Sequence, residues 1–551
     1  MRLRSTLLVP LLCTMVAGCS SIGGAPIKHV VELFMEGGEK PLREAMRPLR
    51  GGSRVLVFAL DGVGEEDFRR ALDEGNLPSV AALLGPRAGA GVYAHGYAAS
   101  GTLSVLPSIT MAPWTSAFTG RPPGETGVPG NEWFERETMR FYAPAPVAFS
   151  SNDHAIRMYT KGLIGEQTHV PTLFEQADVR SFVSMLPLSR GADLLQLPKL
   201  NTFGDLFFAT VQGAVRGRPT RKSYSETDQN SVRSVIAGLK EYGAPDLQVV
   251  YFPGIDLMRH VSEQPDVEVQ RYLAEITDSL IASVLDEYRR QGVLERTYVM
   301  FVSDHGHTPV MTDDRHRLLN EPAELLDTIG VRVRSFGIDS KTDDFQAVLA
   351  YQGSMAFVYL ADRSTCRTAG ERCAWSRSPR ETEDVLPVVR AFDRANRTGE
   401  LMPALKGTID LIFARPSKHF WQRGARPFQV WDGQQLVPIA TYLKRHPRPD
   451  LLRLAERMQE LGTGPYGAHA GDVVLLANAR ADRPVEMRFY FGADRYTSWH
   501  GSPSAPDSRV PLVVAHPARS GTELRQLTSR TLGATPSLLD VTPLVRALLR
   551  N

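Results

Sequence analysis

The chain has 551 residues, of which 42% are hydrophobic and 23% are charged, and its formal net charge is +2. This composition supports a large buried core. The small net charge differs from the strongly basic or acidic balance of proteins that bind nucleic-acid polymers or acidic partners, so the composition argues against those functions.

The first residues have the pattern of a secretory signal peptide. Two arginines precede an apolar stretch at 7–16, which is too short to span a bilayer. The next residues, Val-Ala-Gly-Cys, resemble a bacterial lipobox, which implies a signal peptide at 1–18 and acylation of Cys19, and several acyl chains give stable anchoring. Ser20 then implies sorting to the outer membrane. We expect a lipid-anchored protein of the bacterial cell envelope, in the periplasm or at the surface; the alternative is an ordinary cleaved signal with an incidental cysteine.

Residues 19–52 are predicted to form a tether between the anchor and the folded domain. We expect one amphipathic helix between Val30 and Arg47, interrupted by two glycines at 37–38 and stopped by Pro48. The folded domain is expected to occupy residues 53–551.

Four short apolar runs predict strands that are buried on both faces of a parallel sheet. They are Arg54–Leu60, Gln248–Phe252, Tyr298–Val302 and Val510–Ala515. Helical patterns lie between them, at 67–84 with a break near residues 76–78, and at 266–290. This alternation predicts an α/β fold, with helices covering both faces of a mostly parallel sheet.

Two stretches interrupt the alternation and are predicted to be cap insertions. The first, at about 135–245, contains a phenylalanine-bearing segment at 203–215 and a basic loop. We interpret that loop as solvated surface, although it also suits an anionic substrate or a lipid headgroup; its basic residues are Arg216, Arg218, Arg221 and Lys222. The second, at about 310–497, contains Cys366 and Cys373, which are expected to form a disulfide in an oxidising compartment. A metal site is the alternative for the cysteines, but no further soft ligand lies nearby.

Acidic residues closely follow three of the predicted strands, where the carboxyl ends of an open α/β sheet form its ligand crevice. An aspartate and a histidine four residues apart can present both side chains to one ion, and an adjacent pair points in two directions. Taken singly, each residue is as well explained by helix capping or a core hydrogen bond. Taken together they suffice for two zinc ions with open positions. The set is Asp61, Asp256, His260, Asp304, His305 and His500.

A threonine-rich segment lies between the first two acidic positions. It runs from Thr110 to Gly120 and is followed by a Pro/Gly-rich turn and Asn131. A threonine hydroxyl needs a Lewis acid to become a nucleophile, and at the start of a helix the backbone amides favour a phosphate. Asn131 is placed to donate to a phosphoryl oxygen. On this segment alone, an ordinary N-cap is the favoured interpretation of Thr110; with the ligand set, the segment predicts a metal-dependent hydrolase.

The ordered set resembles the alkaline phosphatase superfamily, in particular its type I phosphodiesterase and nucleotide pyrophosphatase branch. The matching pieces are Leu-Asp-Gly-Val at 60–63, 110–120, Asn131, Asp256-x-x-x-His260, 304–306 and His500-Gly501. The resemblance implies an α/β/α sandwich and a small phosphorylated substrate such as a nucleotide. It implies one zinc held by Asp256, His260 and His500, and another held by Asp61, Asp304 and His305 with Thr110 as its nucleophilic ligand. Asn131 would hold phosphoryl oxygens, and a phosphothreonine intermediate would form and be hydrolysed.

Some positions depart from the family pattern. Thr126-Gly127 stands where the family usually has His-Gly, but that histidine is not a metal ligand, so the chemistry is expected to survive. The Lys-x-Arg pair that contacts a monoester dianion in related phosphomonoesterases is matched only by Arg190. We therefore favour a diester or pyrophosphate substrate, with an alkaline phosphomonoesterase as the alternative. His469 is a rival ligand to His500, which we prefer because His-Gly there precedes the last strand.

Other classes of protein are disfavoured by specific absences. A sulfatase would need a Cys/Ser-x-Pro-x-Arg motif, and a serine hydrolase a Gly-x-Ser-x-Gly elbow; the threonine segment has neither. A non-catalytic envelope lipoprotein that retains the fold would have no need of the complete ligand set.

Overall fold

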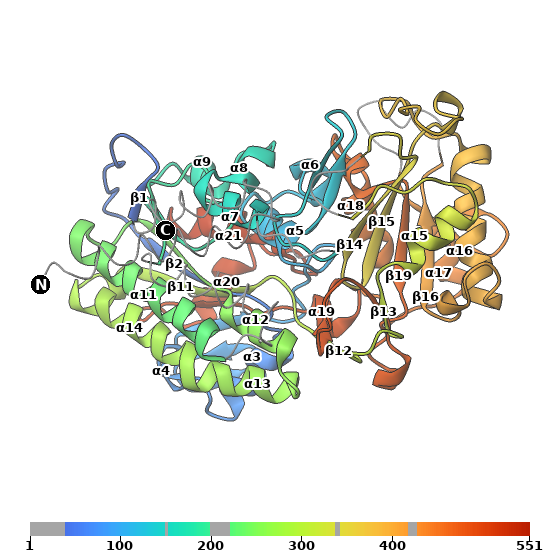
Figure 1. Ribbon diagram of the computed structural model, residues 1–551. Helices are drawn as coiled ribbons and strands as arrows, with labels where there is room; N and C mark the ends of the chain where they lie inside the picture. The colour runs from blue at the N-terminus through green and yellow to red at the C-terminus, as the bar shows by residue number, and fades with distance from the viewer. Residues whose placement is uncertain (1–38, 149–152, 199–220, 337–341, 417–426) are drawn as a thin grey trace, which may run out of the picture.

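The computed structural model describes residues 39–148, 153–198, 221–336, 342–416 and 427–551. The predicted signal peptide, Cys19 and the segment 203–215 lie outside these residues. Two sheets organise the chain, one of ten strands and one of six, and they stand side by side in Figure 1. Among the described helices, none combines the length and the apolar composition that crossing a bilayer would require.

The ten-stranded sheet is parallel in its middle and antiparallel toward its edges. β2 (Arg54–Leu60) runs parallel to both of its neighbours, β10 (Leu247–Phe252) and β11 (Thr297–Ser303). The parallel part continues from β10 through β8 (Ser181–Ser184) to β9 (Leu194–Gln196). The other strands pair antiparallel with their neighbours; they are β1 (Glu39–Pro41), β22 (Leu512–Ala515), β5 (Gly96–Ala99), β4 (Val92–Tyr93) and β3 (Arg87–Gly89).

Helices cover both faces of this sheet, which is why its central strands are buried along their whole length. One face packs on α3 (Glu65–Asp73), α4 (Pro78–Leu84), α11 (Arg221–Tyr242), α13 (Pro265–Tyr272) and α14 (Asp278–Arg290). The other packs on α5 (Met111–Ala117), α8 (Leu163–Gln167), α9 (Leu173–Ala177) and α21 (Val541–Leu548). The two groups of helices lie on opposite sides of the strands in Figure 1. The predicted three-layer α/β/α sandwich is therefore confirmed.

The two predicted helical segments are confirmed with their interruptions. The segment at 67–84 consists of α3 and α4, and Pro78 begins the second helix because proline is well tolerated at the first helical position. The segment at 266–290 consists of α13 and α14, joined by a π-helical turn at Leu273–Thr277.

The direction of the last predicted strand was wrong. We expected the apolar run at 510–515 to join a parallel sheet, but β22 pairs antiparallel with β11, with Val302 opposite Leu512. Apolar composition shows only that a strand is buried on both faces; it carries no information about direction. The consequence is that the amino end of β22 lies beside the carboxyl end of β11, at the same edge of the sheet as the carboxyl end of β2.

Part of the first predicted insertion belongs to the main sheet. β8, β9 and α11 all lie within the range 135–245, and they extend the sheet and cover one face of it. Of the basic loop, Arg216 and Arg218 lie outside the described residues. Arg221 forms ion pairs with Glu268 and Glu275, at 3.1 Å and 2.9 Å, and Lys222 is mostly exposed.

The range 310–497 contains the six-stranded antiparallel sheet. Its strand order is β14-β15-β19-β16-β17-β18, and its helices α15 (Glu321–Thr328) and α16 (Leu386–Thr398) pack on one face. Cys366 and Cys373 form a disulfide in a loop after β15, the pairing that we predict from the sequence. The strands are β14 (Ala347–Gln352), β15 (Met355–Leu360), β19 (Val473–Ala477), β16 (Ile409–Ala414), β17 (Gln429–Trp431) and β18 (Leu436–Pro438).

The second half of the predicted tether is part of the folded unit. Residues 39–47 contain bends and β1, which pairs with β9. The remainder of the range in which we expected an amphipathic helix, 30–38, lies outside the described residues. Arg47 donates hydrogen bonds from its backbone and its side chain to the buried carboxylate of Asp193.

Candidate active site

The sheet register brings two of the acidic residues together. Leu60 and Ser303 are paired across β2 and β11, so Asp61 and Asp304, the next residues on each strand, leave the same edge of the sheet side by side. Asp256 comes from α12 (Gly254–Val261), the helix that begins just after β10. His260 lies one turn further along α12, on the same face as Asp256, because residues four apart are neighbours on a helix.

Asp61 and Asp304 are each held by one carboxylate oxygen. The Oδ2 atom of Asp61 accepts hydrogen bonds from the indole N–H of Trp114, at 3.3 Å, and from the hydroxyl of Tyr251. The Oδ1 atom of Asp304 accepts the backbone N–H of Gly62 at 3.2 Å. In each case the other oxygen is buried and has no hydrogen-bond partner.

His305 completes this group in the same manner. Its Nδ1–H donates to the backbone carbonyl of Gly306 at 3.1 Å, so its Nε2 atom carries a lone pair. That Nε2 atom has no hydrogen-bond partner and lies 3.4 Å from Oδ1 of Asp61 and 3.3 Å from Oδ2 of Asp304. The three unpartnered atoms face one another, and together they could hold one metal ion. We call Asp61, Asp304 and His305 the second cluster.

We call Asp256, His260, His307 and His500 the first cluster. In two of its histidines, a backbone carbonyl fixes which ring nitrogen carries the proton. His260 Nδ1–H donates to the Ser498 carbonyl at 2.7 Å, and His500 Nδ1–H donates to the Ser108 carbonyl at 3.1 Å. A carbonyl only accepts, so both Nε2 atoms carry lone pairs. These lone pairs face each other at 3.2 Å, and Oδ1 of Asp256 lies 3.4 Å and 3.5 Å from the two nitrogens. Three acceptor atoms this close together fit a shared cation.

A further histidine, His307, lies in the first cluster and was not assigned a role from the sequence. Its Nε2 atom lies 2.8 Å from Oδ1 of Asp256. Asp256, His260, His307 and His500 together form a buried group that could hold a metal ion. In the sequence, His307 lies two residues after His305. That spacing is not characteristic of metal ligands, so it indicated no role.

Burial and repulsion act on the titratable groups of both clusters. Burial, followed by repulsion from the other carboxylates, holds the pKa of Asp61 and of Asp304 well above the ordinary value. Burial lowers the pKa of His305 to about 4 and that of His500 well below its ordinary value. Burial alone would raise the pKa of Asp256, but the nearby His260 and His307 outweigh the effect of burial and lower this pKa. His305 and His500 are therefore neutral near pH 7, as metal ligation requires.

Thr110 stands at the start of α5, in a segment that contacts both clusters. Its side chain makes no capping hydrogen bond with the helix, so the ordinary N-cap role is not seen. Two residues before it, Ser108 binds His500, and one turn after it, Trp114 binds Asp61. The Thr110 segment therefore contacts one residue from each cluster, His500 through the backbone carbonyl of Ser108 and Asp61 through the indole N–H of Trp114.

Asn131 is fixed beside this helix by one end of its amide. Its Oδ1 atom accepts the backbone N–H of Met111 at 2.9 Å, and its own backbone N–H donates to Gln352 at 2.8 Å. With Oδ1 used in this way, the Nδ2 donors of the side chain are directed away from Met111. Asn131 thus adjoins Thr110 with its amide donors available on the other side.

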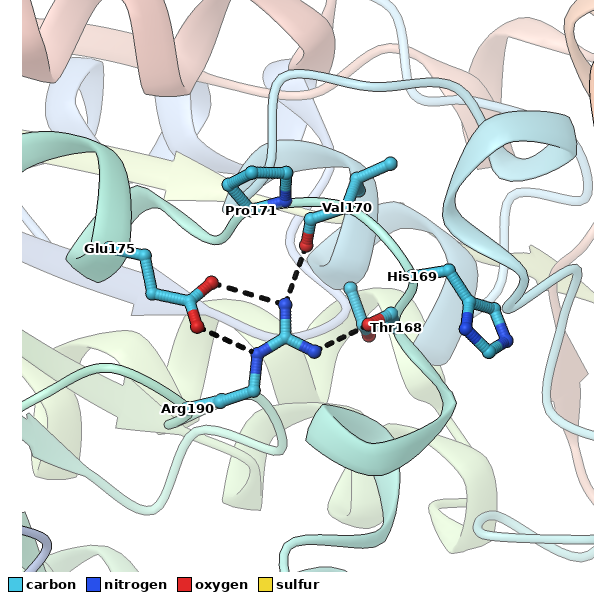
Figure 2. Close-up of a pocket in the computed structure, with 6 residues that line it drawn as sticks. All are labelled: Thr168, His169, Val170, Pro171, Glu175 and Arg190. Carbon is cyan, nitrogen blue, oxygen red and sulfur yellow. Dashed lines mark hydrogen bonds and ion pairs between the residues drawn. The ribbon is translucent and has the colours of Figure 1, made fainter.

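Two candidates from the sequence lie elsewhere. His469 Nδ1 bonds the carbonyl of Gly127 at 2.8 Å, and neither metal-type group contains it. Arg190 lines a surface pocket, where Figure 2 shows its guanidinium directed at backbone carbonyls and at Glu175. Its five N–H groups are used by Glu175 and by the carbonyls of residues 165, 168 and 170. Arg190 therefore has no donor left for a phosphate.

Comparison with known proteins identifies a family. Residues 55–405 match the model of the type I phosphodiesterase / nucleotide pyrophosphatase family. A search of curated proteins finds no match to the sequence.

Two similar solved structures cover nearly the whole chain. One is an inactive variant of murine ectonucleotide pyrophosphatase / phosphodiesterase 5 in complex with AMP, with 12% identity, 90% of this chain and 95% of that chain covered, and a TM-score of 0.48. The other is phosphonoacetate hydrolase from Sinorhizobium meliloti 1021 in complex with phosphonoformate, with 16% identity, 92% and 100% covered, and a TM-score of 0.48. The family match spans more than half of the chain, and the assignment of the chain rests on it.

Replacing Asp304 by asparagine is expected to separate charge repulsion from metal binding. Because the folded-state pKa of Asp304 is raised, its contribution to stability is present at low pH and is lost as the pH rises through that pKa. The metal-free variant should therefore have a higher Tm than the metal-free wild type at about pH 8, and the gain should vanish as the pH falls below about 4, where an ordinary aspartate becomes protonated.

The same variant should lose the stabilisation that a metal ion gives. A cation present at about 1,000 times its Kd stabilises a site by about 4 kcal/mol, and Asp304→Asn should forfeit most of this at one site. Scanning calorimetry with a chelator and with added zinc measures both effects. A metal-free variant less stable than the wild type at about pH 8 would contradict the charge repulsion.

Proposed function

Because the chain belongs to the type I phosphodiesterase / nucleotide pyrophosphatase family, we propose that it hydrolyses phosphate diesters or pyrophosphates at a two-zinc site through a phosphothreonine intermediate. Membership of this family makes it a phosphoric ester hydrolase. The observation that carries the finer proposal is the pair of buried Asp/His clusters. Asp61, Asp304 and the three ligand histidines each use one atom in an anchoring hydrogen bond and turn another toward the fellow ligands.

The donor sets fit zinc better than a hard cation. Imidazole nitrogens and carboxylate oxygens in groups of three, with room for a further ligand, are typical of catalytic zinc. Two nitrogens bound to one tetrahedral zinc at about 2.0–2.1 Å lie about 3.3 Å apart, and the Nε2 atoms of His260 and His500 are 3.2 Å apart. We assign Asp256, His260 and His500 to one zinc, and the second cluster together with Thr110 to the other.

The residues of the chain then have separate tasks. When bound, the two cations would acidify the Thr110 hydroxyl and offset negative charge on the phosphate. Thr110 Oγ1 gives its proton to solvent and attacks phosphorus, the bond to the leaving oxygen breaks as the new bond forms, and the leaving oxygen takes up a proton from solvent. The Nδ2 donors of Asn131 hold a phosphoryl oxygen during this displacement. Water then attacks the phosphothreonine, which releases the phosphorylated product and restores the Thr110 hydroxyl.

The state of Arg190 supports a singly charged phosphate group as the substrate. A monoester dianion benefits from an additional cation near its free oxygens. Arg190 was the arginine that matched such a pair in related phosphomonoesterases, and its donors are all used within the fold. A small diester or pyrophosphate, such as a nucleotide derivative, has no need of that contact.

We also propose that the enzyme is anchored in the bacterial cell envelope through Cys19. The support comes from the sequence, where a short apolar stretch ends in Val-Ala-Gly-Cys, and from the disulfide between Cys366 and Cys373, which suits an oxidising compartment. We place the catalytic domain at 53–551, on the periplasmic or surface side of the outer membrane.

Removal of the Thr110 hydroxyl should abolish the reaction without disturbing the fold. Thr110→Val keeps the shape of the side chain, and we expect kcat/KM for bis-p-nitrophenyl phosphate to fall by about 10³-fold or more, as loss of a nucleophile does elsewhere. Acid quench with labelled substrate should trap a phosphoenzyme only in the wild type. The matched control is Thr115→Val, which removes a buried hydroxyl without a hydrogen-bond partner from the same helix. A phosphoenzyme that survives in Thr110→Val would rule out this nucleophile.

Diesters should be better substrates than monoesters. We expect kcat/KM for bis-p-nitrophenyl phosphate to exceed that for p-nitrophenyl phosphate by about tenfold or more, because one missing charged hydrogen bond costs about 1.5–3 kcal/mol. Arg190→Gln is the control: it should lower thermal stability and leave the ratio unchanged. A preference for the monoester that Arg190→Gln removes would establish the phosphomonoesterase instead.

Cys19→Ser should detach the protein from the membrane. Without the acylated cysteine, no acyl chains remain for anchoring, so fractionation of the cells should find the variant in the soluble fraction with unchanged specific activity. The wild type should be released only by detergent. A wild-type protein that is soluble without detergent would show an ordinary cleaved signal.

A further inference from the structure

We propose that His307 is a positioning residue, which donates its Nε2–H to the carboxylate of Asp256 and so holds that ligand in place for the first metal ion. The inference rests on the two-metal site of the proposed function. The family resemblance assigns no role to His307. The position of the His307 proton decides whether the first ion has three or four protein ligands.

The partner of Nδ1 separates His307 from the ligand histidines. His260, His305 and His500 each direct Nδ1 at a backbone carbonyl, which can only accept, so their protons must lie on Nδ1. His307 directs Nδ1 at the hydroxyl of Ser498, at 3.0 Å. A hydroxyl both donates and accepts, so this ring is free to carry its proton on Nε2.

The contact with Asp256 requires the proton to be there. Nε2 of His307 lies 2.8 Å from Oδ1 of Asp256, which is closer than the 3.4 Å and 3.5 Å of His260 and His500. At 2.8 Å two bare acceptors repel each other, whereas an N–H donor and a carboxylate form a charge-assisted hydrogen bond of ordinary length. The Ser498 hydroxyl then donates to Nδ1 of His307.

The Ser498 hydroxyl also has a second acceptor within reach. It lies 3.1 Å from the carbonyl of Arg259. If its proton went to that carbonyl, Nδ1 of His307 would have to donate, and Nε2 would become a fourth ligand of the first ion. A zinc ion with four protein ligands is closed, as in structural sites, and has no position for substrate. Catalysis at the first ion is compatible only with the proton on Nε2.

The position of His307 also connects the two clusters. A Cβ atom on Gly62 would lie 2.8 Å from Nε2 of His307 and 2.9 Å from Cα of Asp256, so both residues pack directly against the Gly62 backbone. The same glycine donates its N–H to Asp304. His307 therefore fixes Asp256 at the place where the first cluster meets the loop of the second.

Two substitutions at this position distinguish a hydrogen-bond donor from a ligand. His307→Gln keeps an N–H donor near the place of Nε2 but supplies a poor zinc ligand, whereas His307→Leu keeps neither. We expect the purified wild type to bind two zinc ions, and His307→Leu to bind one of them about 10- to 100-fold more weakly, the usual cost of losing a group that orients a ligand. His307→Gln should restore most of this affinity.

Metal affinity is measured by competition with a chromophoric chelator, and coordination by the visible spectrum of the cobalt-substituted protein. The spectrum of His307→Gln should match that of the wild type. The matched control is His316→Leu, which removes another buried histidine hydrogen-bonded to an aspartate, outside both clusters. It should leave both zinc affinities unchanged.

Each outcome has a definite reading. If His307→Leu binds two zinc ions as tightly as the wild type, His307 has no role at the site and this inference alone fails. If His307→Gln loses as much affinity as His307→Leu and its cobalt spectrum changes, His307 is a ligand and the positioning role is wrong. If His307→Leu does not fold, His307→Gln decides between a hydrogen-bond donor and a ligand. Wild-type zinc affinity and an unchanged cobalt spectrum support the donor, and a loss of affinity with a changed spectrum shows a ligand. If the wild type binds no zinc, the two-metal site fails and this inference fails with it.

Discussion

The structure of the site depends on buried carboxylates that are oriented by neutral donors and are not neutralised by them. Asp61 is held by an indole N–H and a phenol O–H, and Asp304 by a backbone N–H. Such donors fix the direction of a carboxylate, but they leave its charge in place inside the protein, where an uncompensated charge is costly. The raised pKa of both groups is the sign of this cost. The fold therefore aims bare oxygens at one point, and a cation at that point would offset the cost.

The second sheet contributes to the site through one hairpin. Gln352, at the end of β14, accepts the backbone N–H of Asn131 and donates to the carbonyl of Glu132. Ser354, at the turn of the same hairpin, donates its backbone N–H to the carbonyl of His500 at 3.0 Å. The hairpin thus connects the loop of Asn131, the proposed hydrogen-bond donor to the phosphate, with the loop of His500, the last proposed metal ligand. An insertion predicted only as a cap has a second task, which is to fix two loops relative to each other.

The sequence predicted those parts of the molecule that depend on local pattern. The strands at 54–60 and 298–302 were readable because continuous apolar runs show burial on both faces, and Asp61 and Asp304 because they follow those strands directly. The direction of β22 was not readable, because it depends on where the chain returns from the second sheet. His500 was selected by family order although it precedes its strand; only an antiparallel β22 explains how it reaches the same edge. His307 carried no signal, because its role depends on a contact with Ser498, 191 residues away.

The backbone of one residue, Gly62, links the two clusters. The N–H of Gly62 donates to Asp304, and its carbonyl accepts a hydrogen bond from Arg259 at 3.1 Å. Arg259 lies on the same turn of α12 as Asp256 and His260, so its anchorage fixes the helix that carries the first cluster. Gly62 has a φ of 71°, and a side chain there would collide with Asp256 and His307. The N–H and the C=O of Gly62 belong to two successive rigid peptide planes joined at its Cα, so with φ held at this value the separation of the two groups of ligands does not depend on side-chain rotamers. A reaction that divides attack and departure between two cations needs a fixed separation of this kind.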